Sequence, residues 1–286
     1  MLTPKLIALD LDGTLLNDNG EITPYTREQI RSAVRRNITV IISSGRPFTG
    51  IPAKEAKELG IEYAITTNGA AVYRILDGAC LYEDGLSPDL AIDVLTHLPS
   101  KHQHVDIFVR GAAYTQTSTF HIVRSSQLLP ESLKKYIMAN RRQVENITDY
   151  IIEKRPTVQK VTMNFEQNPD GSFISREETH AYLLGRPELN VVCGGCLDLE
   201  FTKAGVSKAK GLRFLCDYLK IPVESSMACG DSENDLDILK AAGLSVAMEN
   251  AEDIVKEVCG YVTSSCNEDG VGRAIARFAG APEQEV

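Results

Sequence analysis

The chain has 286 residues, a length that predicts one large or two moderate domains, each able to bury its own core. Its net charge is −9 and it has no run of basic residues, which excludes a generic surface for the phosphate backbone of DNA or RNA. Its apolar runs are far shorter than the roughly 20 residues of a membrane span, and its first residues lead straight into a strand. The seven cysteines are scattered, which is typical of a reducing compartment, so we expect a cytoplasmic protein.

The first 84 residues alternate strands and helices, a pattern typical of a parallel sheet with crossover helices. The expected strands are 6–9, 38–43 and 63–67, and the expected helices are 24–36 and 48–59. Thr23 is the expected N-cap of the first helix, because Pro24 follows it at the first helical position. The pair Asn68-Gly69 predicts a hairpin turn after the third strand.

The alternation changes after Gly85, and the middle of the chain reads as a separate α+β domain. The helices expected there are 88–98, 131–140, 148–154 and 176–184, and the expected strands are 105–110, 113–116, 158–165, 190–193 and 197–201. The run Cys193-Gly-Gly-Cys196 lies between the last two strands. Without a second pair or nearby histidines it is weak evidence for zinc or redox chemistry, so it predicts a hairpin turn.

The parallel-sheet pattern then resumes. The expected helices are 207–219, 234–242, 253–258 and 271–278, and the expected strands are 225–229, 244–247 and 261–263. We therefore expect an α/β protein in which a doubly wound, mostly parallel, Rossmann-like sheet is built from residues 1–84 and 203–286. Residues 85–202 would form the inserted α+β domain, and two linkers near Gly85 and Gly205 suit a hinge.

The first strand ends in two carboxylates, Asp10 and Asp12, one residue apart and followed by Gly13-Thr14. In an open α/β sheet, functional groups gather beyond the carboxyl ends of the strands. Carboxylates there can bind a hard cation, and an ionised Asp can also attack phosphorus. The alternative is a strand that runs into an Asp-Gly turn, but the doublet on an apolar strand favours chemistry.

The other expected strand ends and one helix start also carry polar groups. These are Ser44, Gly45, Arg46, Asn68, Lys208, Asp231 and Asn234. Each has a structural alternative, because Ser44-Gly45 can be a turn, Asp231 can be an N-cap and Lys208 can be a solvated lysine. A chemical role for the whole set is favoured because otherwise all these alternatives must hold at once.

Together these groups supply what phosphoryl transfer needs: an in-line nucleophile, charge neutralisation, a cation and an acid for the leaving group. Asp10 can be the nucleophile and form an aspartyl-phosphate, while Asp12 can act as general acid and then as general base. Mg²⁺ can lie between Asp10, the backbone carbonyl of Asp12 and Asp231. Three carboxylates at one cleft would repel one another, which argues independently for a cation.

The remaining groups are assigned to the phosphate and the substrate. Ser44, the Gly45 N–H and Lys208 can bind phosphoryl oxygens, and Asn234 can orient Lys208 or Asp231 or reach the phosphate itself. The other residues expected to contact the phosphate or the substrate are Leu11, Arg46 and Asn68.

Four motifs resemble those of the haloacid dehalogenase superfamily of phosphohydrolases: D-x-D-G-T at 10–14, Ser44, Lys208 and G-D-x-x-N-D at 230–235. Five further runs resemble its Cof-type sugar-phosphatase subfamily: S-G-R-P at 44–47, T-N-G-A at 67–70, V-S-K at 206–208, V-A-M-E-N-A at 246–251 and E-D-G-V at 268–271. The resemblance implies a cap domain inserted after the third strand, phosphorylation of Asp10, acid–base catalysis by Asp12 and a Mg²⁺ site completed by Asp231. Lys210 is a second candidate for the lysine role, because Lys-Ala-Lys stands where Lys-Gly is usual.

We therefore expect a Mg²⁺-dependent phosphatase that hydrolyses small phosphorylated metabolites, such as sugar phosphates, through an aspartyl-phosphate. Two alternatives stay open. A phosphomutase would return the phosphoryl group to the sugar, and a phospho-ligand sensor would bind without turnover. Intact Asp10 and Asp12 argue against the sensor, because binding alone needs neither a nucleophile nor an acid.

Overall fold

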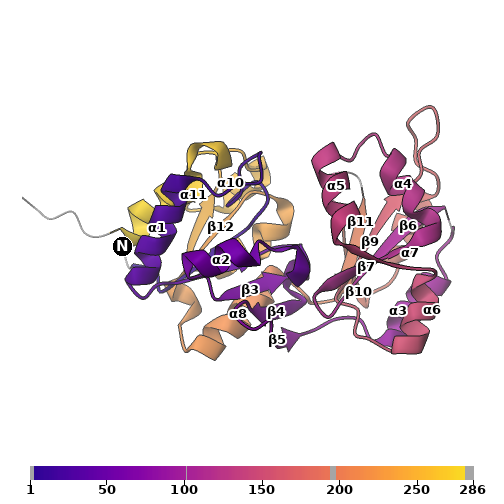
Figure 1. The fold of residues 1–286 in the computed structure, drawn as a ribbon, viewed down its shortest axis with the longest axis horizontal. Coiled ribbons are helices and arrows are strands. Elements are labelled where there is room, and N and C mark those ends of the chain that lie inside the picture. The colour runs from indigo at the N-terminus through magenta and orange to yellow at the C-terminus, as the bar shows by residue number, and fades with distance from the viewer. Residues whose placement is uncertain (1–2, 101, 194–197, 281–286) are drawn as a thin grey trace, which may run out of the picture. The chain divides into compact units, whose positions relative to one another are not determined.

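The computed structural model describes residues 3–100, 102–193 and 198–280, and its contacts divide the chain into two compact units (Figure 1). Unit 1 consists of Met1–Gly45, Pro52–Tyr82 and Ser207–Val286, and unit 2 consists of Arg46–Ile51 and Glu83–Val206. The short segment Arg46–Ile51 thus groups with the inserted part of the chain. The assignment of 1–84 with 203–286 as a catalytic core, and of 85–202 as a specificity domain, stays a prediction.

Unit 1 is built on an eight-stranded sheet with the order β14-β13-β12-β1-β2-β3-β4-β5. Its strands are β1 (Leu6–Leu9), β2 (Thr39–Ser43), β3 (Tyr63–Thr66), β4 (Ala71–Arg74), β5 (Cys80–Glu83), β12 (Ser226–Gly230), β13 (Leu244–Ala247) and β14 (Tyr261–Val262). Strand β1 pairs in parallel with both β2 and β12, and its four apolar side chains are fully buried. The predicted α/β fold with a mostly parallel sheet is confirmed.

The helices of unit 1 are α1 (Pro24–Arg35), α2 (Ala53–Leu59), α8 (Lys208–Leu219), α9 (Leu236–Ala241), α10 (Asp253–Val258) and α11 (Gly270–Ala279). Helices α1 and α11 pack side by side (Figure 1). The Thr23 side chain caps α1 by accepting a hydrogen bond from the Thr26 N–H, as predicted.

The prediction of one continuous helix over 48–59 is wrong. A 3₁₀ turn, η1 (Phe48–Gly50), is followed by the extended residue Ile51, and α2 begins only after Pro52. Ile51 has ψ of 153°, because a residue that precedes proline is driven out of the helical region. This break leaves η1 as a separate segment, and η1 belongs to unit 2.

Unit 2 is built on a six-stranded mixed sheet with the order β10-β11-β9-β6-β7-β8. Its strands are β6 (Gln103–Val109), β7 (Ala112–Gln116), β8 (Arg141–Val144), β9 (Lys160–Phe165), β10 (Leu189–Cys193) and β11 (Leu199–Lys203); its helices are α3 (Pro88–Thr96), α4 (Phe120–Ser125), α5 (Glu131–Asn140), α6 (Ile147–Lys154) and α7 (Arg176–Leu184). Helices α3 and α6 pack together over one apolar core (Figure 1).

Helix α4 and strand β8 of unit 2 were not predicted from the sequence. Strand β8 reads Arg-Arg-Gln-Val, which has no apolar alternation, and it pairs only along one side with β7. The hairpin turn predicted at Cys193-Gly-Gly-Cys196 falls on 194–197, which lie outside the described residues.

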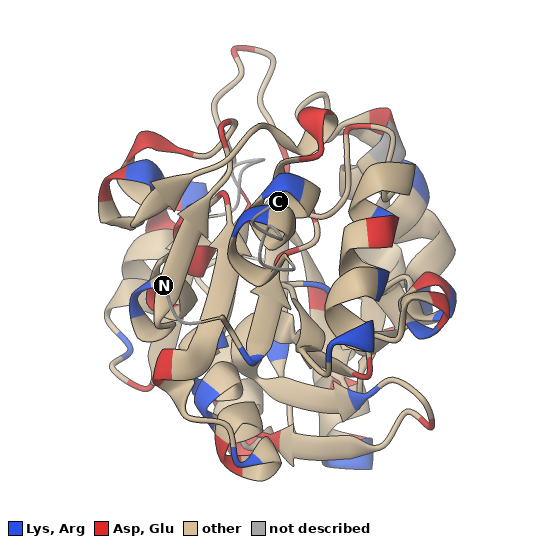
Figure 2. Ribbon diagram, turned by 90° about the vertical axis from the view of Figure 1, so that its left-hand side faces the viewer, with Lys and Arg blue, Asp and Glu red and all other residues tan. Residues whose placement is uncertain are grey.

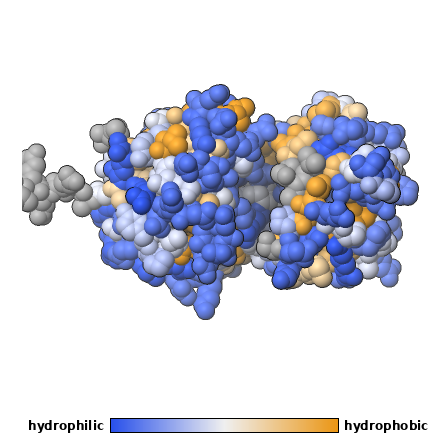
Figure 3. Space-filling view, turned by 90° about the horizontal axis from the view of Figure 1, so that it is seen from above, coloured by the Kyte–Doolittle hydropathy of each residue, from blue (hydrophilic) through white to orange (hydrophobic). Residues whose placement is uncertain are grey.

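In Figure 2 the ribbon is coloured for Lys, Arg, Asp and Glu mainly on helices and loops, and the visible strands are mostly tan. The face drawn in Figure 3 is mostly hydrophilic, with scattered hydrophobic side chains. In the part of the chain that the structure describes, no helix has the length and apolar character needed to cross a membrane.

Candidate active site

The carboxyl ends of β1, β2 and β12 bring the first predicted site residues to one edge of the sheet. Asp10 follows β1, and its N–H donates to the Cys229 carbonyl of β12 at 3.1 Å. Ser44 follows β2 and donates its N–H to the Ile65 carbonyl of β3 at 2.9 Å. Since Asp231 directly follows β12, Asp10, Ser44 and Asp231 all lie at this edge.

Lys208 is the first residue of α8, whose N-terminus is capped by the Ser207 side chain. Its Nζ donates to Oδ1 of Asp10 at 2.7 Å, to Oδ1 of Asp235 at 2.6 Å and to Oδ1 of Asn234 at 3.1 Å. Burial by itself lowers the pKa of this ammonium, but the charges of Asp10 and Asp235 outweigh burial and raise it. Lys208 is therefore held as a buried cation between two carboxylates.

The carboxyl groups of Asp10 and Asp231 both have raised pKa values. For Asp10 the main cause is burial; Lys208 opposes it, and the charges of Asp235 and Asp231 add to it. Burial likewise raises the pKa of Asp231 to about 6, against a hydrogen bond from Thr14 Oγ1 at 2.7 Å. It is costly for both of these carboxyl groups to be ionised at once, and a bound cation would stabilise their carboxylate forms.

One oxygen each of Asp10, Asp231 and Asp235 lies within 4.8 Å of the other two, so these three could hold a metal ion. Carboxylate oxygens are the ligands that Mg²⁺ prefers. Asp235 is already held by several donors, because its Oδ1 accepts from Lys208 and its Oδ2 accepts from the N–H groups of Asp231 and Ser232. We therefore favour Asp10 and Asp231 as ligands and Asp235 as the residue that positions them.

Asp12 lies two residues beyond β1, and its side chain is exposed. Its negative charge is close enough to Asp231 to contribute to the raised pKa of that group. The predicted division of labour, in which Asp12 transfers protons and gives the metal only its backbone carbonyl, stays a prediction. Leu11 is fully buried, so its backbone is the part that could contact a phosphate.

Two residues of the site, Asp235 and Thr14, were missing from the predicted set. Asp235 is fully buried, binds Lys208 and forms a capping box with Ser232. Thr14 is 1% exposed and donates to Asp231. Both lie inside the quoted motifs, and the spacing Ser232-x-x-Asp235 is itself a capping-box signal.

Asn234 accepts from the lysine, and Asn68 lies beside Asn234. The Asn68 N–H donates to the Ser44 carbonyl at 3.2 Å, and Asn234 Nδ2 donates to Asn68 Oδ1 at 3.5 Å. Asn68 has φ of 56° and Thr67 has φ of 51°, a left-handed conformation that is strained for a β-branched residue. The antiparallel pairing of β3 with β4 across this turn confirms the predicted hairpin.

Arg46 differs from the rest of the predicted site residues, because it belongs to unit 2. Gly45 is the last residue of its segment of unit 1, and Arg46 begins the segment that groups with unit 2. Arg46 Nη1 donates to the Gly50 carbonyl at 3.0 Å, and its guanidinium carbon lies 4.8 Å from the centre of the Tyr136 ring.

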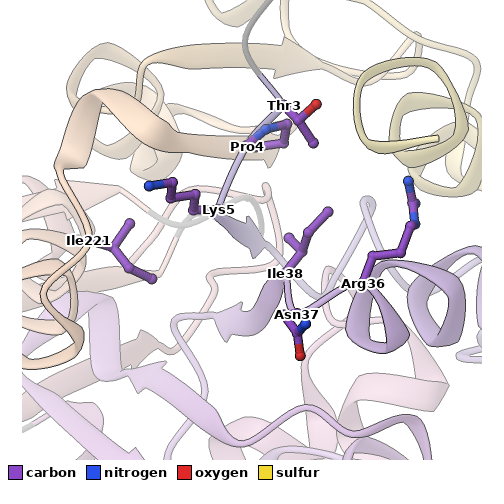
Figure 4. Close-up of a pocket in the computed structure, with 7 residues that line it drawn as sticks. All are labelled: Thr3, Pro4, Lys5, Arg36, Asn37, Ile38 and Ile221. Atoms are coloured by element: carbon purple, nitrogen blue, oxygen red, sulfur yellow. The ribbon is translucent and has the colours of Figure 1, made fainter. Parts of the chain in front are cut away.

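Lys210 is exposed, whereas Lys208 reaches the carboxylates, so the geometry favours Lys208 for the lysine role. A pocket of about 420 Å³ lies at the opposite edge of the sheet, where Lys5 and Ile38 precede β1 and β2 (Figure 4). It is lined by Thr3, Pro4, Lys5, Arg36, Asn37, Ile38 and Ile221. Because none of these is a predicted site residue, this pocket is separate from the carboxylate cluster.

The fold and the cluster at the strand ends define a class of α/β phosphohydrolases. The chain belongs to the haloacid dehalogenase-like hydrolases, because the model of that family matches residues 7–275. It is 31% identical over 279 residues to the 5-amino-6-(5-phospho-D-ribitylamino)uracil phosphatase YcsE of Bacillus subtilis, covering 96% of this chain and 95% of that protein. It is 28% identical to the phosphatase YwpJ of the same organism, covering 93% and 97%.

Solved structures agree with this assignment. A haloacid dehalogenase-like hydrolase from B. subtilis matches with a TM-score of 0.80 and 26% identity, covering 96% of this chain and 99% of that one. The subclass IIB sugar phosphatase BT4131 has the same fold, with a TM-score of 0.77 and 23% identity over 97% of this chain and 100% of that one. The predicted family and its Cof-type subfamily are confirmed, and the protein is a phosphatase of small phosphorylated metabolites.

Proposed function

We propose that the protein hydrolyses phosphate monoesters of sugars or sugar alcohols through an aspartyl-phosphate on Asp10, with Mg²⁺ as cofactor. The observation that carries this proposal is the contact between Asp10 and Lys208. Oδ1 of Asp10 accepts from Nζ of Lys208 at 2.7 Å, which fixes the carboxylate and leaves Oδ2 as the atom that we assign as nucleophile.

The proposed reaction has two displacements at phosphorus. In the first, Asp10 Oδ2 forms a bond to phosphorus, the ester P–O bond breaks, and the leaving alkoxide takes a proton from Asp12. In the second, Asp12 removes a proton from water, the water oxygen attacks phosphorus, and the bond to Asp10 breaks. Inorganic phosphate leaves, and both aspartates return to their starting states.

Lys208 has two tasks in this proposal. Its charge favours the ionised form of Asp10 against the burial that raises the pKa of this carboxyl, and it offsets the negative charge of the phosphoryl oxygens. Asp10, Asp231 and the backbone of Asp12 would hold Mg²⁺, which supplies further positive charge at the phosphoryl group. The fit rests on the oxygen-only donor set and on the raised pKa values of Asp10 and Asp231.

Support for the substrate class comes from two relatives. Proteins that are 31% and 27% identical to this chain, YcsE and YitU of B. subtilis, are 5-amino-6-(5-phospho-D-ribitylamino)uracil phosphatases. A ribityl chain is a sugar alcohol, so that compound and simple sugar phosphates present the same kind of ester. We also propose a cytoplasmic location, which is supported by the six free cysteines among the described residues.

The test is phosphate release by the purified protein with Mg²⁺, from an aryl phosphate and from a panel of sugar, sugar-alcohol and ribitylaminouracil phosphates. We expect turnover of the aryl phosphate and preference for one of the metabolites. Free phosphate distinguishes hydrolysis from the phosphomutase alternative, in which an isomeric phosphosugar accumulates. If the wild-type protein releases no phosphate from any compound, the proposed function is wrong.

A further inference from the structure

The sheet of unit 2 has one apolar and one polar face. Val105 and Ile107 of β6 and Val161 of β9 lie in the apolar core. Because side chains alternate along a strand, Asp106 of β6 and Lys160 of β9 point to the other face. Both are nonetheless at most 4% exposed, so polar side chains are buried on this face.

Most of these buried polar groups are satisfied by one another. Asp106 accepts from Arg141 Nε at 2.7 Å and from Thr115 Oγ1 at 2.6 Å, and Lys160 donates to Glu200 at 2.6 Å. These contacts pair each buried charge with an opposite one. A buried polar network that only stabilises the fold requires such satisfied partners.

Arg141 and Tyr136 break this pattern. The Arg141 side chain is only 7% exposed, and its Nη1 is buried without a hydrogen-bond partner among the described residues. The hydroxyl of Tyr136, on α5, is likewise buried without a partner. Leaving buried donors unsatisfied is costly, so a pair of them at one place needs an explanation.

The guanidinium groups of Arg141 and Arg46 both lie near the Tyr136 ring. The guanidinium carbon of Arg141 lies 5.9 Å from the ring centre, and that of Arg46 lies 4.8 Å from it. Gly50 lies against the Tyr136 hydroxyl: a Cβ built on Gly50 would be 1.9 Å from that oxygen. The cluster therefore unites Arg46, predicted to contact the substrate, with two donors that the sequence did not single out.

We propose that Arg141 and Tyr136 form a binding subsite on unit 2 for planar acceptor oxygens, a carboxylate or a ring carbonyl, in the non-phosphate part of the substrate. A guanidinium offers only donors and a phenol offers one, so acceptor oxygens match both groups. This inference rests on the proposed function and adds to it a preference among phosphorylated metabolites.

The experiment compares kcat/KM within two matched pairs of substrates. One pair is 6-phosphogluconate, with a carboxylate, and glucose 6-phosphate, without one; the other is uridine 5′-monophosphate, with ring carbonyls, and ribose 5-phosphate, without them. We expect the wild-type protein to prefer the acceptor-bearing member of at least one pair. The pair that shows the preference identifies the acceptor group.

The decisive variant is Tyr136→Phe, which removes the hydroxyl and keeps the ring that both guanidinium groups contact. We expect it to lower the preference by about tenfold, chiefly through KM. The midpoint of thermal unfolding should stay the same or rise, because a buried unsatisfied hydroxyl is lost. Arg141→Lys should lower the same preference while keeping the charge.

The control is Tyr114→Phe. The hydroxyl of Tyr114 lies on the opposite face of the sheet and accepts from Arg142, so the kcat/KM values for all four substrates should be unchanged.

The inference is overturned if the wild-type protein turns over an aryl phosphate but shows no preference within either pair. It is also overturned if Tyr136→Phe leaves the preference intact, whatever its thermal stability, since the hydroxyl then takes no part in binding the substrate. Failure of the proposed function looks different, because the wild-type protein would then release no phosphate even from the aryl phosphate.

Discussion

Nζ of Lys208 lies 2.7 Å from Oδ1 of Asp10, although the two residues are 198 positions apart in the sequence. The same ammonium lies 2.6 Å from Oδ1 of Asp235, and both carboxylate side chains are at most 8% exposed. One buried cation thus joins the residue after β1 to the turn after β12. The stability of unit 1 and the chemistry of the site therefore depend on the same contact.

Replacing this lysine should damage both stability and turnover. Lys208→Met leaves Asp10 and Asp235 buried without their cation, so we expect a loss of about 3–5 kcal/mol in the free energy of unfolding and at least about 100-fold in kcat. Urea denaturation and steady-state kinetics measure the two effects. Lys210→Met is the control; because Lys210 is exposed, its free energy of unfolding should change by less than about 0.5 kcal/mol. Equal losses in both variants would show that the choice of Lys208 is wrong.

The close approach of Gly13 to Asp231 should be essential for both stability and turnover. A Cβ on Gly13 would lie 2.4 Å from Asp231 Oδ2, and the residue has φ of +76°. Gly20 has φ of +75° but nothing within 4 Å, so Gly20→Ala measures the backbone strain alone, about 1 kcal/mol. Gly13→Ala adds displacement of Asp231, so it should be more destabilising and lower kcat by at least about tenfold. Similar kinetics for the two alanine variants would contradict a role for this contact.

The buried Asp106 predicts an acid-sensitive contribution to stability. Burial opposes its ionisation, but hydrogen bonding to His104 and the charge of Arg141 lower its pKa to about 2. With an unfolded pKa of about 3.9, its contribution is present above that value and is lost as the pH falls toward 2. Between pH 6 and pH 3 the wild type should lose about 1 kcal/mol more than Asp106→Asn, measured by urea denaturation. The exposed Asp237→Asn should follow the wild type; if Asp106→Asn does so too, the assigned cause is incorrect.

Mg²⁺ should stabilise the protein through Asp231. A ligand that binds the folded state at 100 times its Kd adds about 2.7 kcal/mol, so millimolar Mg²⁺ should raise the midpoint of thermal unfolding of the wild type. Asp231→Asn should lose most of this shift, because a ligand carboxylate is gone. Asp12→Asn should keep it, because only the Asp12 backbone is assigned to the metal. Loss of the shift in Asp12→Asn would overturn that division of labour.

The sequence predicted those parts of the fold and the site that depend on local pattern. The buried strand β1, the cap at Thr23 and the polar residues at strand ends all follow from apolar runs, helix-start signals and parallel pairing. The missed elements lack such patterns, as the polar β8 shows. The role of Asp235 and the grouping of Arg46 with Tyr136 depend on contacts between distant residues, which periodicity does not encode.

The central claim, that Asp10 is the nucleophile, is tested most directly by acid-quenching the enzyme during turnover and locating bound phosphate by mass spectrometry. We expect one phosphoryl group on the peptide that contains Asp10 in the wild type and in the slow variant Asp12→Asn, and none in Asp10→Asn, whose turnover should fall by at least about 1000-fold. Phosphate bound to another residue, or an Asp10→Asn variant that still forms the adduct, would contradict it.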